Sequence, residues 1–110
     1  MKVYNYKNRK IRLGKATYNS NNTLAVVMLY TNEWGEEDEE VITTNIDDSD
    51  ILADDTQAFV DTNNMGNGIV QWLVKNKIAI KTPFFGCSGY CKYPLMIFTK
   101  EALDNMVEIK

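Results

Sequence analysis

The chain of 110 residues contains no histidine. This absence excludes Ser-His-Asp and Cys-His nucleophilic mechanisms, metal sites built on imidazole, and the general base that enzymes use most often. Paired-carboxylate hydrolysis would need two selected acids, and nothing in the sequence selects two of the 15 acidic side chains. We therefore expect a protein that is not an enzyme and that uses no cofactor and no metal.

Cysteine is scarce as well, since the chain has only two, in a CxxxC arrangement. Two cysteines make no disulfide framework, and a zinc site would need two further thiol or imidazole ligands that the chain lacks. A redox pair would favour CxxC. We interpret Cys87 and Cys91 as loop cysteines packed near aromatic residues, with an intermolecular bridge as the alternative. Those aromatic residues are Phe84, Phe85, Tyr90 and Tyr93.

Long hydrophobic runs are missing too, because the longest one, residues 24–30, has seven residues. A membrane-spanning helix needs about 20. The basic start of the chain has no apolar stretch of the kind found in signal peptides. Apolar residues make up 45% and charged residues 25%, as in ordinary globular proteins. These values predict a single domain over residues 1–110 and a cytoplasmic location.

Acidic side chains are absent from residues 1–32, which carry six Lys or Arg. Basic side chains are absent from residues 33–61, which carry 12 of the 15 acids. Residues 62–110 carry six basic and three acidic side chains, so the three parts contribute +6, −12 and +3 to the net charge of −3. The charge is segregated along the sequence, and it could be segregated in space too.

Strands are predicted over residues 10–18 and 23–32, on either side of a polar turn at 19–22. A third strand is predicted over 41–46, which would place the sequence EWGEEDEE, residues 33–40, at the exposed tip of a hairpin. Residues 47–57 are expected to form a long acidic connection, and 58–62 a short extended piece.

The second half of the chain predicts two helices. Ile69, Trp72 and Leu73 have helical spacing, which indicates a helix over about 64–76 with an N-cap at Asn63 or Asn64. Residues 93–98 read as a strand that Pro94 confines to an edge or a strand start, and Thr99 can cap a short helix over 100–106. The expected fold class is α+β: an antiparallel sheet of about four strands with one main helix and a short C-terminal helix.

The acidic stretch is the main candidate for a binding site. Like charges about 8–10 Å apart repel by roughly 0.4–0.5 kcal/mol in water, so an uncompensated cluster costs stability. The stretch also contains a tryptophan, the residue type most enriched at interaction hot spots. A basic surface, such as a cleft that holds nucleic acid, is the matching partner. The predicted partner-binding residues are Glu33, Trp34, Glu36, Glu37, Asp38, Glu39, Glu40, Asp47, Asp48 and Asp50.

Two other interpretations of the acidic stretch stay open. It can be a solvated loop that only confers solubility. It can also bind calcium through Asp47, Asp48 and Asp50, although it lacks the Gly and Glu that an EF-hand loop places at its sixth and twelfth positions. As a phosphate mimic the extended segment would carry one charge per about 8 Å, well below the density of a duplex.

The basic N-terminal part offers a different surface. Lys7, Arg9, Lys10 and Arg12 are interleaved with Tyr4 and Tyr6, a pattern that suits phosphate pairing and base stacking on nucleic acid. The same basic side chains could instead neutralise the acidic residues of the protein itself.

Several segments are similar to a family of short uncharacterised proteins carried by plasmids, conjugative elements and phages of Gram-positive bacteria. These are YNYKNRKIRL at 4–13, TTNI at 43–46, AFVDTNN at 58–64 and SGYCKYPLMIF at 88–98. Some members of this plasmid-borne set look like anti-CRISPR inhibitors of the type II RNA-guided nuclease. The resemblance implies a cytoplasmic protein of a bacterial host cell, with no catalytic residues and no cofactor.

The expected function is inhibition of a type II CRISPR effector nuclease, or of its guide-RNA complex, by an acidic surface that binds a basic nucleic-acid channel. Interference with guide-RNA loading is a second possible mode, because the basic N-terminal part differs from a pure DNA mimic. The alternative is a nucleic-acid-binding accessory protein of a mobile genetic element, acting through Lys7, Arg9, Lys10 and Arg12. Salt dependence separates the two, because phosphate contacts weaken steeply with salt.

Overall fold

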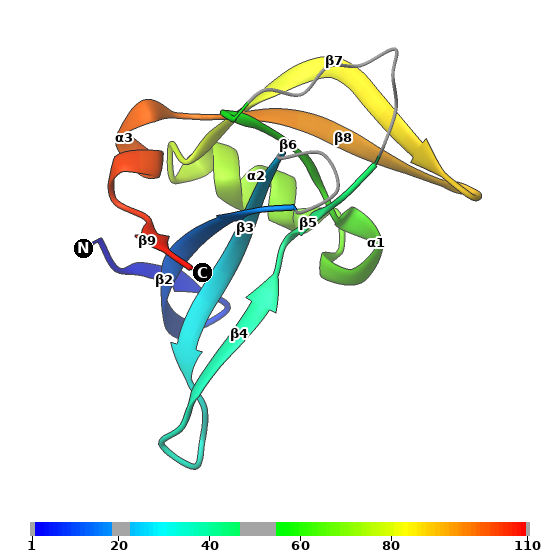
Figure 1. Ribbon diagram of the computed structural model, residues 1–110. Helices are drawn as coiled ribbons and strands as arrows, with labels where there is room; N and C mark the ends of the chain where they lie inside the picture. The colour runs from blue at the N-terminus through cyan, green and yellow to red at the C-terminus, as the bar shows by residue number, and fades with distance from the viewer. Residues whose placement is uncertain (1, 19–22, 47–54, 110) are drawn as a thin grey trace.

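The computed structural model describes residues 2–18, 23–46 and 55–109, which form nine strands and three helices (Figure 1). The strands make two sheets. The first has the order β1-β2-β3-β4, with β9 parallel to β2, and the second has the order β5-β6-β8-β7. The strands of the first sheet are β1 (Tyr4–Tyr6), β2 (Arg9–Thr17), β3 (Leu24–Thr31), β4 (Glu37–Val41) and β9 (Val107–Glu108).

The first sheet begins with a tight hairpin. Lys7 and Asn8 connect β1 to β2 with φ angles of 49° and 63°, the left-handed pair that a two-residue turn requires to match strand twist. Along β2 the apolar residues alternate, so Ile11 and Leu13 are buried on one face, and Leu13 pairs with buried Met28 of β3. This face of the sheet forms one wall of the main core.

The second sheet consists of β5 (Thr43–Thr44), β6 (Gln57–Val60), β7 (Ala79–Ser88) and β8 (Cys91–Phe98). The chain crosses from the first sheet to the second at Ile42, which is fully buried between β4 and β5. The Ile42 N–H donates to the Val26 carbonyl at 3.0 Å, and the Ile42 carbonyl accepts from the Asp61 N–H at 2.9 Å. The backbone of one residue thus connects both sheets, while its side chain lies in the core that they share.

Three short helices complete the fold: α1 (Thr62–Met65), α2 (Gly68–Lys75) and α3 (Lys100–Asp104). The buried side chains of α2, Ile69 and Leu73, belong to the core cluster that residues of both sheets share. The Trp72 indole N–H donates to the Asn5 carbonyl at 2.8 Å, and its ring meets Tyr4 and Tyr6 edge-on. Helix α2 therefore packs between β1 of the first sheet and β7 of the second (Figure 1).

The α+β class and the antiparallel pairing agree with the prediction, but the single sheet of about four strands is wrong, because the strands divide between two sheets. The helix predicted over 64–76 is two helices, since Gly66 adopts a φ of +82° and ends α1. Its N-cap is Asp61, whose carboxylate accepts from the Asn64 N–H at 3.1 Å, and not Asn63 or Asn64. The cap of α3 by Thr99 is confirmed.

No helix in the described ranges is both long and apolar enough to cross a membrane.

Candidate functional site

The acidic residues 33–40 lie on the β3–β4 hairpin, which projects from the body of the molecule (Figure 1). The prediction that all eight form a hairpin tip is wrong. Strand β4 begins at Glu37, which pairs with Thr31 of β3, and the pairing continues to Val41 opposite Val27. The strand predicted over 41–46 is therefore the end of β4 together with the separate β5. Acidic side chains have a low propensity for strands, but the pairing with β3 holds these residues in a strand.

The connection between the two strands, residues 32–36, is held by Asn32. Its side-chain oxygen accepts from the N–H groups of Trp34 and Glu36, both at 3.0 Å. The Asn32 carbonyl also accepts from the Gly35 N–H at 3.0 Å, and Gly35 has a φ of +80°, a conformation that glycine adopts without steric cost. Trp34 is held at this ordered tip with 75% of its surface exposed.

The carboxylates of β4 divide between the two faces of the strand because successive side chains point in opposite directions. Asp38 and Glu40 lie on the core side, where Glu40 pairs with buried Met28. Glu37 and Glu39 lie on the outer side. The hairpin thus presents acidic groups on both faces, with only Glu40 half-buried.

Arginines of β2 reach across β3 to two of these carboxylates. Arg12 forms an ion pair with Glu37, and Arg9 lies 3.9 Å from Glu40 while its guanidinium stacks 3.7 Å from the centre of the Tyr30 ring. Exposed pairs of this kind contribute at most about 1 kcal/mol each. The acidic stretch is therefore partly compensated within the molecule, which is one of the two roles that the sequence left open for these basic side chains.

These pairs also bear on the basic N-terminal residues predicted to contact nucleic acid. Arg9 and Arg12 are engaged by carboxylates of the same chain. Lys7 lies in the β1–β2 turn, with its ammonium 5.3 Å from the centre of the Tyr6 ring, and Lys10 is exposed on β2. The four side chains do not form one free basic surface.

Four carboxylates of the hairpin form no salt bridge among the described residues: Glu33, Glu36, Asp38 and Glu39. The Asp38 side chain accepts from the Glu39 N–H at 2.9 Å, so it is oriented along the strand. We call these four residues and Trp34 the acidic tip. Asp47, Asp48 and Asp50 lie outside the described residues. Within the described ranges, no group of three or more His, Cys, Asp or Glu is arranged to hold a metal ion.

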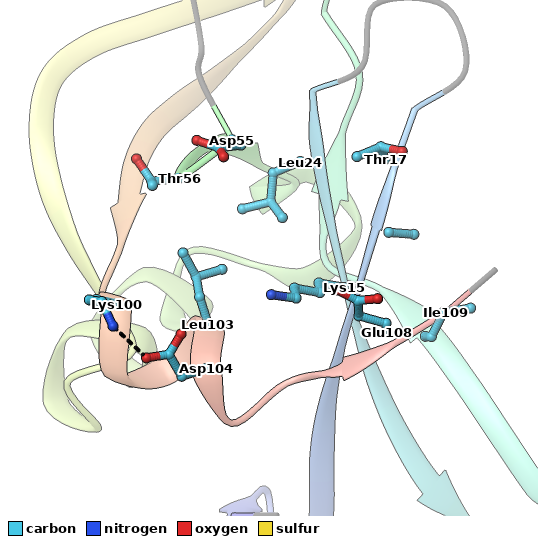
Figure 2. Close-up of a pocket in the computed structure, with 11 residues that line it drawn as sticks. Lys15, Thr17, Leu24, Asp55, Thr56, Lys100, Leu103, Asp104, Glu108 and Ile109 are labelled. Atoms are coloured by element: carbon cyan, nitrogen blue, oxygen red, sulfur yellow. Dashed lines mark hydrogen bonds and ion pairs between the residues drawn. The ribbon is translucent and has the colours of Figure 1, made fainter.

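A hollow of about 640 Å³ lies elsewhere, between the ends of β2 and β3, α3 and β9 (Figure 2). Its charged groups are mixed: Lys15 and Glu108 line one side, and Lys100 pairs with Asp104 at 2.9 Å on the other. No residue of the acidic tip lines it. Several residues that line this hollow are close in sequence to residues 19–22 or 47–54, which are outside the described ranges. We assign the hollow no role.

The two cysteines lie in the β7–β8 hairpin and not in a loop as predicted. Cys87 pairs with Lys92 and Cys91 with Ser88, so their side chains point to opposite faces of the sheet, and both are free. Cys91 packs against the cluster of Phe59, Tyr93 and Leu95, of which only Tyr93 was among the predicted aromatic neighbours, whereas Cys87 is exposed. A hydrogen bond with Cys91, together with burial, raises the pKa of Tyr93.

A family model described as a domain of unknown function (DUF4313) matches residues 12–108. The chain belongs to this family. No curated protein and no solved structure matches it. The DUF4313 match begins within β2 and ends within β9, so it includes the whole β3–β4 hairpin, the three helices and the second sheet.

Proposed function

We propose that this DUF4313 protein acts by binding, and that its acidic tip occupies a basic nucleic-acid channel of a type II RNA-guided nuclease in a bacterial host cell. One observation carries the proposal. Four carboxylates that form no salt bridge among the described residues share one projecting hairpin with an exposed tryptophan.

The two components of the acidic tip have different physical roles. The carboxylates attract a basic surface and accelerate the encounter, an effect that weakens as salt is added. Trp34 supplies the large aromatic contact that typically contributes most to affinity once water is excluded. Because Asn32 already fixes the loop backbone, binding costs less conformational entropy than it would for a mobile loop.

The geometry supports the mode of binding, and the identity of the partner rests on the resemblance described above. RNA-guided nucleases hold the heteroduplex in a positively charged channel that recognises backbone shape. A projecting acidic hairpin fits such a channel at its entrance, where it competes with DNA or with the guide RNA.

The proposal is tested by titrating the protein into a DNA-cleavage assay with a type II nuclease, adding it before or after the guide RNA. Inhibition in both orders is the expected result if the hairpin occupies the DNA-binding channel. Inhibition only before guide loading assigns the same tip to the guide-RNA step. Full cleavage in both orders with several type II nucleases overturns the proposed partner.

A further inference from the structure

A second surface lies on the β7–β8 hairpin, which projects from a different part of the molecule than the β3–β4 hairpin (Figure 1). Between this hairpin and the helices α1 and α2 runs a groove of about 360 Å³. Thr62 of α1, Asn67 just before α2 and Gln71 of α2 contribute to its lining, and the strands contribute Lys81, Phe85 and Lys92. We call this surface the basic groove.

The strand register places the three strand residues on one face. Lys81 pairs with Met96 and Phe85 with Pro94, while Lys92 pairs with Cys87. Positions 92, 94 and 96 of β8 alternate onto the same face, about 6–7 Å apart along the strand. Phe85 of β7 therefore lies between Lys81 of the same strand and Lys92, which is its diagonal neighbour on β8.

An irregularity in β7 produces this arrangement. Three residues, 82–84, stand opposite Leu95 alone, because the register shifts between Lys81 and Phe85. The Thr82 hydroxyl donates to the Leu95 carbonyl at 2.7 Å and accepts from the Phe84 N–H at 3.2 Å, which fixes the bulge. Because the bulge adds two residues, Phe85 stays on the face of Lys81 but is moved one step along it, from the position opposite Lys92 to the position opposite Pro94.

The surroundings of the groove are basic. Residues 62–100 contain five lysines and no carboxylate. The nearest acid in the sequence, Asp61, is buried, and its two side-chain oxygens accept from the backbone and side-chain amides of Asn64. Phe85 leaves 53% of its surface exposed, and its neighbours Phe84 and Tyr90 on the same hairpin are exposed as well, so several aromatic rings of this hairpin are open to a partner.

We propose that the basic groove binds single-stranded nucleic acid. The ring of Phe85 stacks on a base, Lys81 and Lys92 contact the phosphates on either side, and the amides of Asn67 and Gln71 are available to base edges. An acidic peptide would also match the two lysines, but the order of cation, aromatic ring and cation across this face of β7 and β8 follows the alternation of phosphate and base. This inference goes beyond the proposed function and does not depend on it.

The test is fluorescence anisotropy with short labelled oligo(dT) and oligo(U) probes, over a range of salt concentrations. Two phosphate contacts predict a slope of log K against log salt of about −1.4. Comparable affinity for the two probes means that the groove recognises the phosphates and bases that DNA and RNA share. A preference for one probe identifies single-stranded DNA or single-stranded RNA as the ligand. No binding to either probe at low salt overturns the proposal.

Three substitutions and a matched control locate the site. Phe85→Ala should weaken binding on the order of tenfold, and Phe85→Tyr should preserve it, because stacking needs the ring. Lys81→Ala and Lys92→Ala should each reduce the salt slope by about 0.7. Lys75→Ala removes an exposed lysine that does not line the groove, and it should leave binding unchanged.

Because all of these side chains are exposed, the variants should keep the melting temperature of the parent protein, which is measured alongside. Equal loss of binding in Lys75→Ala and Lys81→Ala would contradict the site, since only net charge would then matter. A second copy of the protein is the remaining candidate for the occupant of the groove, and sedimentation velocity tests for it. If Lys81→Ala or Phe85→Ala instead dissolves a self-association of the protein, the groove holds a second copy and the nucleic-acid proposal fails.

Discussion

At the scale of single residues, two glycines set how closely distant segments approach each other. A Cβ on Gly14 would lie 2.5 Å from the Ile109 side chain, and one on Gly86 would lie 2.7 Å from the Phe59 ring. The sequence shows neither approach, because Ile109 and Phe59 are far along the chain and only the folded sheets bring them near. Both positions therefore read as ordinary strand residues until the fold is known.

Gly86→Ala should destabilise the protein by about 1–3 kcal/mol, the usual cost of overpacking a core site. The new methyl would meet Phe59, which is 4% exposed, and Ile46 at 2.9 Å. Chemical denaturation measures the change. Gly68→Ala is the matched control, since nothing lies within 4 Å of its Cβ at the start of α2, and it should be neutral or stabilising. Equal stability of the two variants would contradict this packing.

Tyr18 should make stability depend on pH in the alkaline range. Burial raises its pKa above the ordinary value of 10.0, although its hydrogen bond with Thr43 acts in the opposite direction. A raised pKa means that its stabilising contribution is present below about pH 10 and is lost as the pH rises through the folded-state pKa. Tyr18→Phe should therefore lose less unfolding free energy between pH 8 and pH 11 than the parent protein. Identical losses would contradict the assignment.

Trp34→Ala should separate stability from binding. The side chain is 75% exposed, so the free energy of unfolding should change by less than about 0.5 kcal/mol. If the tip binds as proposed, affinity for the partner should fall by about 2 kcal/mol or more, the size of a hot-spot effect. Titration calorimetry with the nuclease measures it. Unchanged affinity would remove Trp34 from the contact surface.

At the scale of the elements, the sequence predicted the strands and the helix cap for which the local sequence pattern is strong. The apolar alternation of β2 and β3 and the Thr99 cap of α3 were predicted within a residue or two of their observed bounds. Strand β4 was not predicted, because EDEEV has little strand propensity and is specified by its pairing with β3. Strand β7 was missed because Pro83 and the neighbouring bulge interrupt its alternation.

The same contrast applies to the candidate site. The concentration of acids and the exposure of Trp34 could be predicted from composition and spacing. The pairing of Arg9 and Arg12 with Glu40 and Glu37 could not, because it depends on the order of the strands in the sheet.

Asp61→Ala tests the junction between β6 and α1. The Asp61 carboxylate accepts from both amides of Asn64 and caps the helix, so its loss should cost about 1 kcal/mol of unfolding free energy. Asp61→Asn keeps an acceptor oxygen and should recover most of that stability. Urea denaturation distinguishes them. If both substitutions cost the same, the carboxylate acts through its charge and not as a cap.

At the scale of the whole molecule, the charge segregated in the sequence is rearranged by the fold. Arg9 and Arg12 of the basic N-terminal part neutralise two acids of β4. Glu33, Glu36, Asp38 and Glu39 remain on the β3–β4 hairpin without a salt bridge to the described residues, and Lys81 and Lys92 lie on the β7–β8 hairpin. The molecule measures 42 × 27 × 25 Å. It is therefore elongated, and its two projecting hairpins present charges of opposite sign.

The most direct test of the binding account compares two double charge reversals in the nuclease cleavage assay. Glu36→Lys with Glu39→Lys alters the acidic tip, and Glu101→Lys with Glu108→Lys makes the same change of +4 in net charge at exposed sites outside the hairpin. The account predicts that the tip variant needs more than about tenfold higher concentration for half-inhibition, a loss of roughly 1.4 kcal/mol, while the control stays near the parent protein. Equal effects of the two variants, or full inhibition by the tip variant, would contradict it.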